Sequence, residues 1–325
     1  MHDTPDPFRQ VAAVVAIPVR DEVERIPDCL AALGNQDGAV LGVVLLVNNT
    51  RDATMQAIAD CRPALRCPVL AIEHWFPPEQ ANAGRARSLA MQHADRLAPE
   101  ALPLLTTDAD GRAAPDWLGR NLYHLRNGCD AVFGRAEIDP IEATSIPMSL
   151  HQADADECAY AALLDEIACL INPDADDPWP RHTENSGASI AVTRAAYYQV
   201  GGIPTVALGE DRAFYAALRI AGLRIRHAPE VRVVVSGRIL GRAAGGMADT
   251  IRRRLVAPDL WLDDALEPVA ARVMRLRRAL ANPREADSAP MQRVAVSALP
   301  EQMAEALAIR ASLLQQARAL TLVGE

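Results

Sequence analysis

The first half of the chain alternates short apolar runs with segments of helical periodicity, and this alternation constrains the fold more than any other feature. Val11–Ile17 is a continuous apolar run that ends at Pro18, and Glu24–Leu33 follows with apolar residues at helical spacing. A run of this kind is typical of a strand that is buried on both faces. Because the unit repeats, the sequence predicts a mostly parallel sheet covered by helices on both faces. The expected strands are 11–17, 43–47, 69–72, 102–106 and 131–136, and the expected helices are 24–33, 53–61, 81–97 and 115–125.

The second half of the sequence divides into three parts. Residues 142–171 are predicted to form a helical insertion. Regular α/β patterns then resume, with strands over 189–192, 223–226 and 231–235 and a helix over 211–221. After Gly246 the pattern becomes helical, over 250–255, 268–280 and 300–320. We therefore expect an α/β domain over residues 1–245 and a helical C-terminal extension over 246–325.

Composition narrows the classes of function. The net charge of −9 argues against a nucleic-acid partner. Every basic side chain except histidine is an arginine, which excludes P-loops and Schiff-base enzymes that need a lysine. The sequence has no basic and apolar leader and no apolar stretch of about eighteen residues, so a cytoplasmic location is expected. The six cysteines are dispersed without a zinc-site spacing, and reduced thiols are expected.

An acidic pair directly follows the fourth expected strand. The apolar segment ends at Thr106 and Thr107, and Asp108, Asp110 and Gly111 come next. In an extended backbone, residues i and i+2 point to the same side, so both carboxylates could serve one site. Hard divalent cations such as Mg²⁺ or Mn²⁺ prefer such oxygen ligands and often keep substrate phosphates as further ligands. The pair suggests a metal-held nucleotide diphosphate, although Asp-x-Asp-Gly also occurs in ordinary turns.

Polar residues also follow the first and second expected strands, at the edge where open α/β sheets bind ligands. Their amide and carboxylate groups suit a nucleotide base or a ribose. A turn at Asn48–Thr50, with Asp52 as the N-cap of the next helix, is the alternative. The candidate residues are Pro18, Arg20 and Glu22 after the first strand, and Asn48, Asn49 and Asp52 after the second.

The order and spacing of these motifs resemble those of family 2 glycosyltransferases over roughly residues 11 to 240. The resemblance implies the GT-A fold and transfer of a sugar from a nucleotide-diphosphate donor to a hydroxyl acceptor. It also implies that the first two strand ends hold the base and ribose, that Arg87 faces the nucleotide, and that Asp110 with Asp108 binds the metal. The motifs are Ile17-Pro18-x-x-Asp21-Glu22, Val47-Asn48-Asn49-Thr50-x-Asp52, Gly84-x-x-Arg87, Asp108-x-Asp110 and Gly209-Glu210-Asp211.

The same resemblance gives Asp211 the role of catalytic base and places Glu210 in the acceptor site. A base is needed because an acceptor hydroxyl becomes a better nucleophile when its proton is removed during attack. The two acids could instead simply begin a helix, whose dipole favours negative charge there. On the acceptor side, small residues could let the backbone approach the sugar or could allow tight packing. These residues are Ser186, Gly187 and Gly202.

Direct displacement with inversion is the expected reaction. A retaining enzyme similar to glucosyl-3-phosphoglycerate synthase is the alternative, and a non-catalytic protein that binds nucleotide sugars is another. A sugar-nucleotide pyrophosphorylase is disfavoured, since the chain has no lysine and no Gly-rich loop after the first strand.

The sequence departs from the family pattern after its last strand, where many members carry a histidine as third metal ligand. Arg238 and Arg242 occupy this region and could clamp the diphosphate or form a solvated loop. His227 precedes the region and is predicted to be a structural histidine.

The arginines of the C-terminal helices are predicted to lie on the solvated face of amphipathic helices. A lid or a homodimer contact is also considered, and contact with an anionic membrane surface is not favoured. The residues are Arg252, Arg253, Arg254, Arg272, Arg275, Arg277 and Arg278.

Overall fold

The structure, a computed structural model, describes residues 7–99, 101, 103–238, 241, 247–282 and 292–323. The chain divides into two compact units. One unit comprises Met1–Ser145 and Glu184–Asp249, and the other comprises Ile146–Thr183 and Thr250–Glu325. The segment predicted as an insertion therefore groups with the C-terminal helices rather than with the sheet.

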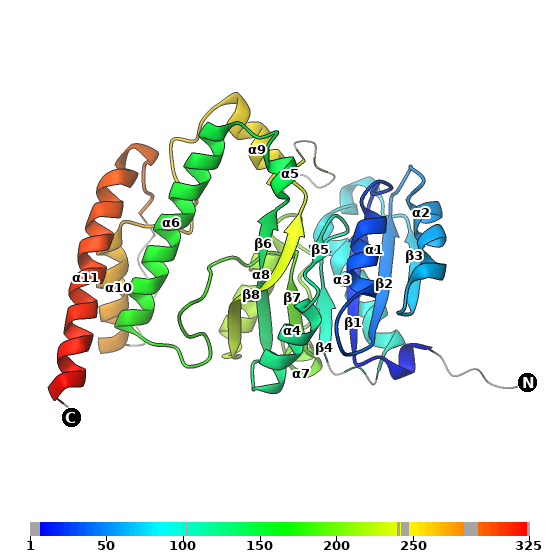
Figure 1. Cartoon of the computed structure of the whole chain (residues 1–325), viewed down its shortest axis with the longest axis horizontal. Helices are drawn as coiled ribbons and strands as arrows, with labels where there is room; N and C mark the ends of the chain where they lie inside the picture. Colours follow the sequence, from blue (N-terminus) through cyan, green and yellow to red (C-terminus); the bar gives the residue numbers. More distant parts are fainter. Residues whose placement is uncertain are drawn as a thin grey trace, which may run out of the picture. The chain divides into compact units, whose positions relative to one another are not determined.

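The first unit is built on a sheet of eight strands among the described residues, in the order β3-β2-β1-β4-β7-β6-β8-β5 (Figure 1). The pairs β3-β2, β2-β1 and β1-β4 are parallel, as the alternating pattern predicts. The strands are β1 (Ala13–Val19), β2 (Leu41–Asn48), β3 (Val69–His74), β4 (Pro103–Thr106), β5 (Arg112–Ala113), β6 (Ala131–Ile138), β7 (Ile190–Thr193) and β8 (Ile225–Val235).

Helices cover both faces of the sheet. On one face, Val15 and Ile17 pack with Leu30 and Trp117, and on the other face Val14 packs with helices from later in the chain. The alternation of β1 side chains between the two cores follows from the two-residue period of a strand. The first face carries α1 (Ile26–Gly34), α2 (Thr54–Cys61) and α4 (Trp117–Arg126), and the second carries α3 (Ala83–Leu97), α7 (Arg194–Gln199) and α8 (Glu210–Ile220).

The second half of the sheet is mixed, because β7 is antiparallel to both β4 and β6. Its residues Ile190, Ala191 and Val192 are fully buried, as they would be in a parallel strand. A strand with two buried faces has the same apolar sequence in either direction, so composition does not indicate its orientation.

Two short strands were expected over 223–226 and 231–235, and the structure has the single strand β8 instead. Its register with β6 shifts between Gly134 and Arg135, which pair with Ala228 and Arg232 respectively. The extra β8 residues include Pro229. A bulge tolerates proline because the residues in it need no ladder hydrogen bond, and the strand continues beyond it.

The second unit is helical and has its own core, in which Tyr160 and Leu164 pack with Val269 and Ala306. Buried Glu267 pairs with Arg272 and Arg275, so these two arginines are not simply solvated. Arg254 likewise pairs with Glu157 and Asp259. None of the described helices is long and apolar enough to cross a membrane. The helices are α6 (Met148–Ile171), α10 (Val269–Ala281), α11 (Leu299–Val323) and, from Thr250 onward, α9 (Met247–Val256).

Candidate active site

The candidate site lies at the carboxyl ends of β1, β2 and β4. In the parallel register Val19 pairs with Val47, and Ala16 pairs with Thr106. The three strands therefore end near one edge of the sheet, and their following loops begin there. This is the edge at which open α/β sheets bind ligands.

A buried guanidinium joins two of the acidic motifs. Arg87 on α3 is only 4% exposed, and it donates from Nη2 to Asp108 Oδ1 at 2.6 Å and from Nε to Glu210 Oε1 at 3.1 Å. Its Nη1 donates to Thr106 Oγ1 at 2.9 Å and to the Gly187 carbonyl at 3.0 Å. Burial acts to lower the pKa of Arg87, but Asp108 and Glu210 outweigh it and raise that pKa. The family resemblance implies that Arg87 faces the nucleotide; in the structure its guanidinium is buried and donates to these protein acceptors.

Gly187 connects this link to Asp211. Its amide donates to Asp211 Oδ2 at 2.9 Å, while its carbonyl accepts from Arg87. A Cβ at position 187 would lie 2.6 Å from Arg87 Nη2, so only glycine allows the guanidinium to pass this close. Glu210 and Asp211, both in the first turn of α8, are thus brought to Asp108 despite their separation in sequence.

The pair Asp108 and Asp110 forms a turn rather than an extended segment. The strand β4 ends at Thr106, and the Gly111 amide donates to the Asp108 carbonyl at 3.1 Å. The expectation that both carboxylates point the same way because the backbone is extended is therefore wrong. The side chains are 37% and 18% exposed, respectively.

Asp110 has a perturbed acidity. Its pKa is raised from 3.8 to about 6, mainly by burial and also by nearby Asp108 and Glu22, while Arg238 and Arg25 oppose the rise. Among the described residues, no cluster of three or more histidine, cysteine, aspartate or glutamate side chains is arranged to hold a metal. Carboxylates are hard oxygen donors of the kind that Mn²⁺ and Mg²⁺ bind together with phosphates and waters.

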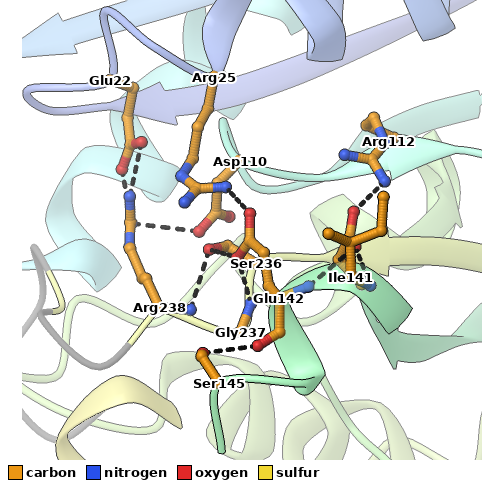
Figure 2. Close-up of polar contacts among 11 residues, drawn as sticks. Glu22, Arg25, Asp110, Arg112, Ile141, Glu142, Ser145, Ser236, Gly237 and Arg238 are labelled. Atoms are coloured by element: carbon orange, nitrogen blue, oxygen red, sulfur yellow. Dashed lines mark hydrogen bonds and ion pairs between the residues drawn. The ribbon is translucent and has the colours of Figure 1, made fainter.

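Arg238 lies against Glu22 and Asp110 (Figure 2). Its Nη1 and Nη2 donate to Glu22 Oε2 and Oε1 at 2.7 and 2.6 Å, and its Nη2 lies 3.1 Å from Asp110 Oδ2. The sequence predicts a diphosphate clamp at Arg238 and Arg242. Arg238 is here paired with carboxylates, and Arg242 lies outside the described residues.

Glu142 is not among the site residues predicted from the sequence, yet it binds the two residues that come directly before Arg238. Its Oε2 accepts hydrogen bonds from Ser236 Oγ and from the Gly237 amide, both at 2.8 Å, and its Oε1 pairs with Arg25. Glu142 lies in the short helix α5 (Pro140–Ala143). The sequence predicts that this segment begins a helical insertion. No local pattern in it indicates that Glu142 lies near the residues that follow the strands.

Residues after β2 tie loops together. Asn49 Nδ2 donates to the Phe76 carbonyl at 2.8 Å, and the Phe76 amide donates to Asn49 Oδ1 at 3.1 Å. Asp52 accepts from the Thr54 amide at 3.0 Å and from the Val23 amide at 3.2 Å. Asn49 and Asp52 are thus engaged in loop contacts; the N-cap of α2 is Ala53 and not Asp52 as the alternative expected, and a nucleotide contact of these residues stays a prediction.

The remaining donor-side candidates keep their place at the strand ends. Asn48 is buried at the end of β2, and Pro18 and Arg20 are half-buried at the end of β1. Their contact with the nucleotide therefore stays a prediction.

The acceptor-side candidates and His227 also have structural contacts. Ser186 Oγ accepts from the Ala188 amide at 3.2 Å, and Gly202, at φ +83°, donates its amide to the Tyr197 carbonyl at 2.8 Å. His227 is buried, and its Nε2 lies 3.0 Å from Asn185 Oδ1. These contacts make His227 a packed core residue of β8, as the sequence predicts.

The raised pKa of Asp110 predicts a pH-dependent gain in stability when its charge is removed. Because the folded-state pKa lies above the unfolded value, ionised Asp110 destabilises the fold as the pH rises from about 4 to about 6. Asp110→Asn should therefore raise the free energy of unfolding at pH 7, by at most about 3 kcal/mol, and leave it unchanged below pH 4. Urea unfolding at both pH values measures this, with Asp116→Asn on the surface of the first unit as the control. An equal effect at pH 4 and pH 7 would contradict the assigned burial of the charge.

Residues 14–176 match the sequence family described as Glycosyl transferase family 2, and no curated protein matches the chain. Among solved structures, S. aureus TarS 1–349 with UDP-GlcNAc is similar at a TM-score of 0.51 and 16% identity, over 85% of this chain and 73% of that one. The mannosyltransferase PcManGT from Pyrobaculum calidifontis, solved with GDP-Man and Mn²⁺, is similar at a TM-score of 0.49 and 22% identity, over 98% of this chain and 83% of that one. Glucosyl-3-phosphoglycerate synthase from Mycobacterium tuberculosis, solved with Mn²⁺, UDP and phosphoglyceric acid, is similar at a TM-score of 0.46 and 14% identity, over 78% of this chain and 80% of that one.

The match to TarS 1–349 in complex with UDP spans 60% of that chain. At these identities the structural similarity concerns the fold, which is the GT-A arrangement of a sheet with helices around it. The sequence match covers half of the chain, including β1 to β6 and the acidic pair after β4. The chain therefore belongs to glycosyl transferase family 2 and has the GT-A fold of a glycosyltransferase.

Proposed function

We propose that this glycosyltransferase moves a sugar from a nucleotide-diphosphate donor to a hydroxyl acceptor, with Mn²⁺ or Mg²⁺ bound at Asp108 and Asp110. The observation that carries the proposal is the link through Arg87, which joins Asp108 to Glu210 and, through Gly187, to Asp211. A metal-binding pair and a base must lie on either side of one reacting bond, and the link between Asp108 and Asp211 supports assigning them to one site. The UDP-GlcNAc complex of TarS supports a nucleotide sugar as the donor class.

In the proposed reaction, an acceptor hydroxyl attacks the anomeric carbon while the bond from that carbon to the diphosphate oxygen breaks. Asp211 accepts the hydroxyl proton, and the diphosphate leaves with the electron pair of the broken bond. Asp108 and Asp110 would hold a divalent cation, which would offset the charge that develops on the departing diphosphate. Attack opposite the leaving group inverts the anomeric configuration.

Asp211 is a better candidate for the base than Glu210. Glu210 is 7% exposed and its carboxylate is held by Arg87 at 3.1 Å, which stabilises the charge that a base must give up. Asp211 is half-buried, and among the described residues it accepts hydrogen bonds from backbone amides, from Gly187 at 2.9 Å and from Arg212 at 2.8 Å. We therefore assign Glu210 to the shape of the acceptor site.

A thermal-shift panel of UDP- and GDP-sugars tests the proposed donor site. A ligand that binds the folded state stabilises it by about 2.7 kcal/mol at one hundred times its Kd. We expect a nucleotide sugar to raise the Tm when Mn²⁺ is present, and Asp110→Ala to abolish that shift. The control Asp116→Ala, which removes an exposed aspartate at the N-cap of α4, should keep the increase in Tm. A shift that survives in Asp110→Ala would contradict the assigned metal site.

The anomeric configuration of the product tests the proposed displacement. With the donor identified by the panel, proton NMR of the first product should show an anomeric configuration opposite to that of the donor. Retained configuration would contradict Asp211 as the base of a single displacement, even if the donor site is assigned correctly.

A further inference from the structure

We infer that the guanidinium of Arg238 competes with the divalent metal ion for the carboxylate of Asp110. Arg238 releases Asp110 only when a nucleotide diphosphate binds. The inference rests on the proposed function, because it concerns the same metal site. It assigns to Arg238 a role in selecting the metal–nucleotide complex over the free metal ion.

The first support is the geometry of the ion pairs. Arg238 makes a bidentate pair with Glu22 at 2.6 and 2.7 Å and lies 3.1 Å from Asp110 Oδ2. The side chains of Glu22, Asp110 and Arg238 are 6%, 18% and 19% exposed. Charges this close and this shielded interact strongly. A metal ion that binds Asp110 must therefore displace, or share the carboxylate with, a positive charge already in place.

The second support is the way the chain holds Arg238 in position (Figure 2). The two residues before it are bound to Glu142, through Ser236 Oγ and the Gly237 amide. The Arg238 amide also donates to Ser236 Oγ at 3.1 Å. Glu142 is itself paired with Arg25. The backbone that carries Arg238 is therefore fixed at the carboxylates, unlike a surface arginine that meets an acid by chance.

The third support is the chemistry of exchange. A nucleotide diphosphate brings phosphate oxygens, which accept the forked donors of a guanidinium as carboxylates do. When the metal and the diphosphate arrive together, Asp110 exchanges the guanidinium for the metal, and Arg238 exchanges Asp110 for a phosphate. The ion pair between Arg238 and Glu22 keeps the guanidinium close to Asp110 and the phosphate during this exchange. A metal ion without nucleotide offers Arg238 no replacement, so the two ligands should bind with positive coupling.

Mn²⁺ affinity, measured by the EPR signal of the free ion, tests the exchange. In the nucleotide-free protein, Arg238→Gln should lower the Kd for Mn²⁺ by about tenfold or more, since the competing charge is gone. With saturating UDP or GDP the gain should disappear or reverse, because the variant has lost a phosphate contact. Arg238→Lys keeps the charge and should stay near the wild-type Kd. Arg120→Gln, which removes an arginine that pairs with the exposed Asp116, is the control and should change the Kd by less than about threefold.

The outcomes separate this inference from the proposed function. If Arg238→Gln leaves nucleotide-free Mn²⁺ binding unchanged or weaker, while Asp110→Asn still abolishes metal-dependent nucleotide binding, the exchange is wrong and the metal site stands. If Asp110→Asn binds Mn²⁺ and nucleotide like the wild type, the proposed metal site itself is wrong. If Arg120→Gln matches Arg238→Gln, the effect is a general one of charge and the direct competition is refuted. Urea unfolding of each variant confirms that the folded protein is being compared.

Discussion

Asp211→Asn is expected to lower kcat by about 10²- to 10⁴-fold, the usual contribution of a general base. The donor Kd should change by less than about twofold, because asparagine can still accept the hydrogen bond from the Gly187 amide and so preserve the local geometry. Steady-state rates with the identified donor, together with calorimetric donor binding, measure the two quantities separately.

The pattern of losses decides the role of Asp211. A base acts only during the reaction, so kcat should fall while ground-state binding persists. Equal losses of kcat and donor affinity would instead make Asp211 a binding residue, and a wild-type kcat would remove it from the mechanism. Asp116→Asn on the surface of α4 should leave both quantities unchanged.

Arg87→Met is expected to destabilise the protein by about 3 to 5 kcal/mol, the range observed when one partner of a buried ion pair is removed. The substitution leaves the buried carboxylate of Glu210 without its counter-charge and removes hydrogen bonds to Thr106 and to the Gly187 carbonyl. Urea unfolding at pH 7 measures the loss of free energy.

A second substitution shows where that loss originates. If the uncompensated charge dominates, Arg87→Met combined with Glu210→Gln should recover part of the stability lost in Arg87→Met alone. Arg120→Met, which breaks an exposed pair with Asp116, should cost less than about 1 kcal/mol. A loss in Arg87→Met as small as that in Arg120→Met would show that the link through Arg87 does not hold the site together.

Much of the sheet could be predicted from the sequence, because its signals are local. The strand ending at Val19 is a continuous apolar run because both of its faces are buried, and the helix ending at Leu97 shows the 3.6-residue periodicity of a helix with one buried face. The direction of β7 and the continuity of β8 across Pro229 could not be predicted. Both depend on pairing with β6, a segment distant in the sequence.

The site was predicted by motif and corrected by geometry. Arg87 binds Asp108 and Glu210, and the Gly187 amide binds Asp211, whereas the resemblance implied that Arg87 contacts the nucleotide. The pattern Gly84-x-x-Arg87 identifies an important arginine and does not show whether its guanidinium faces a ligand or other side chains. That distinction depends on burial, which comes from elements far apart in the sequence.

The loop residues illustrate the same limit. Asn49 and Asp52 have side chains that serve a turn or a ligand equally well, and only their contacts with Phe76 and Val23 show how they are used. Glu142 gave no signal at all, since its partners Ser236 and Gly237 lie more than ninety residues away. Polar networks of this kind are defined by the tertiary structure rather than by local sequence.

The central claim is that these dispersed acids form one metal and nucleotide site. Anomalous diffraction from crystals grown with Mn²⁺ and UDP or GDP tests it most directly. The account predicts a manganese peak bonded to the carboxylate of Asp110, with the diphosphate on its far side and Asp211 facing the position of the sugar. A manganese peak bonded to other residues, or a nucleotide bound away from Asp108 and Asp110, would contradict it.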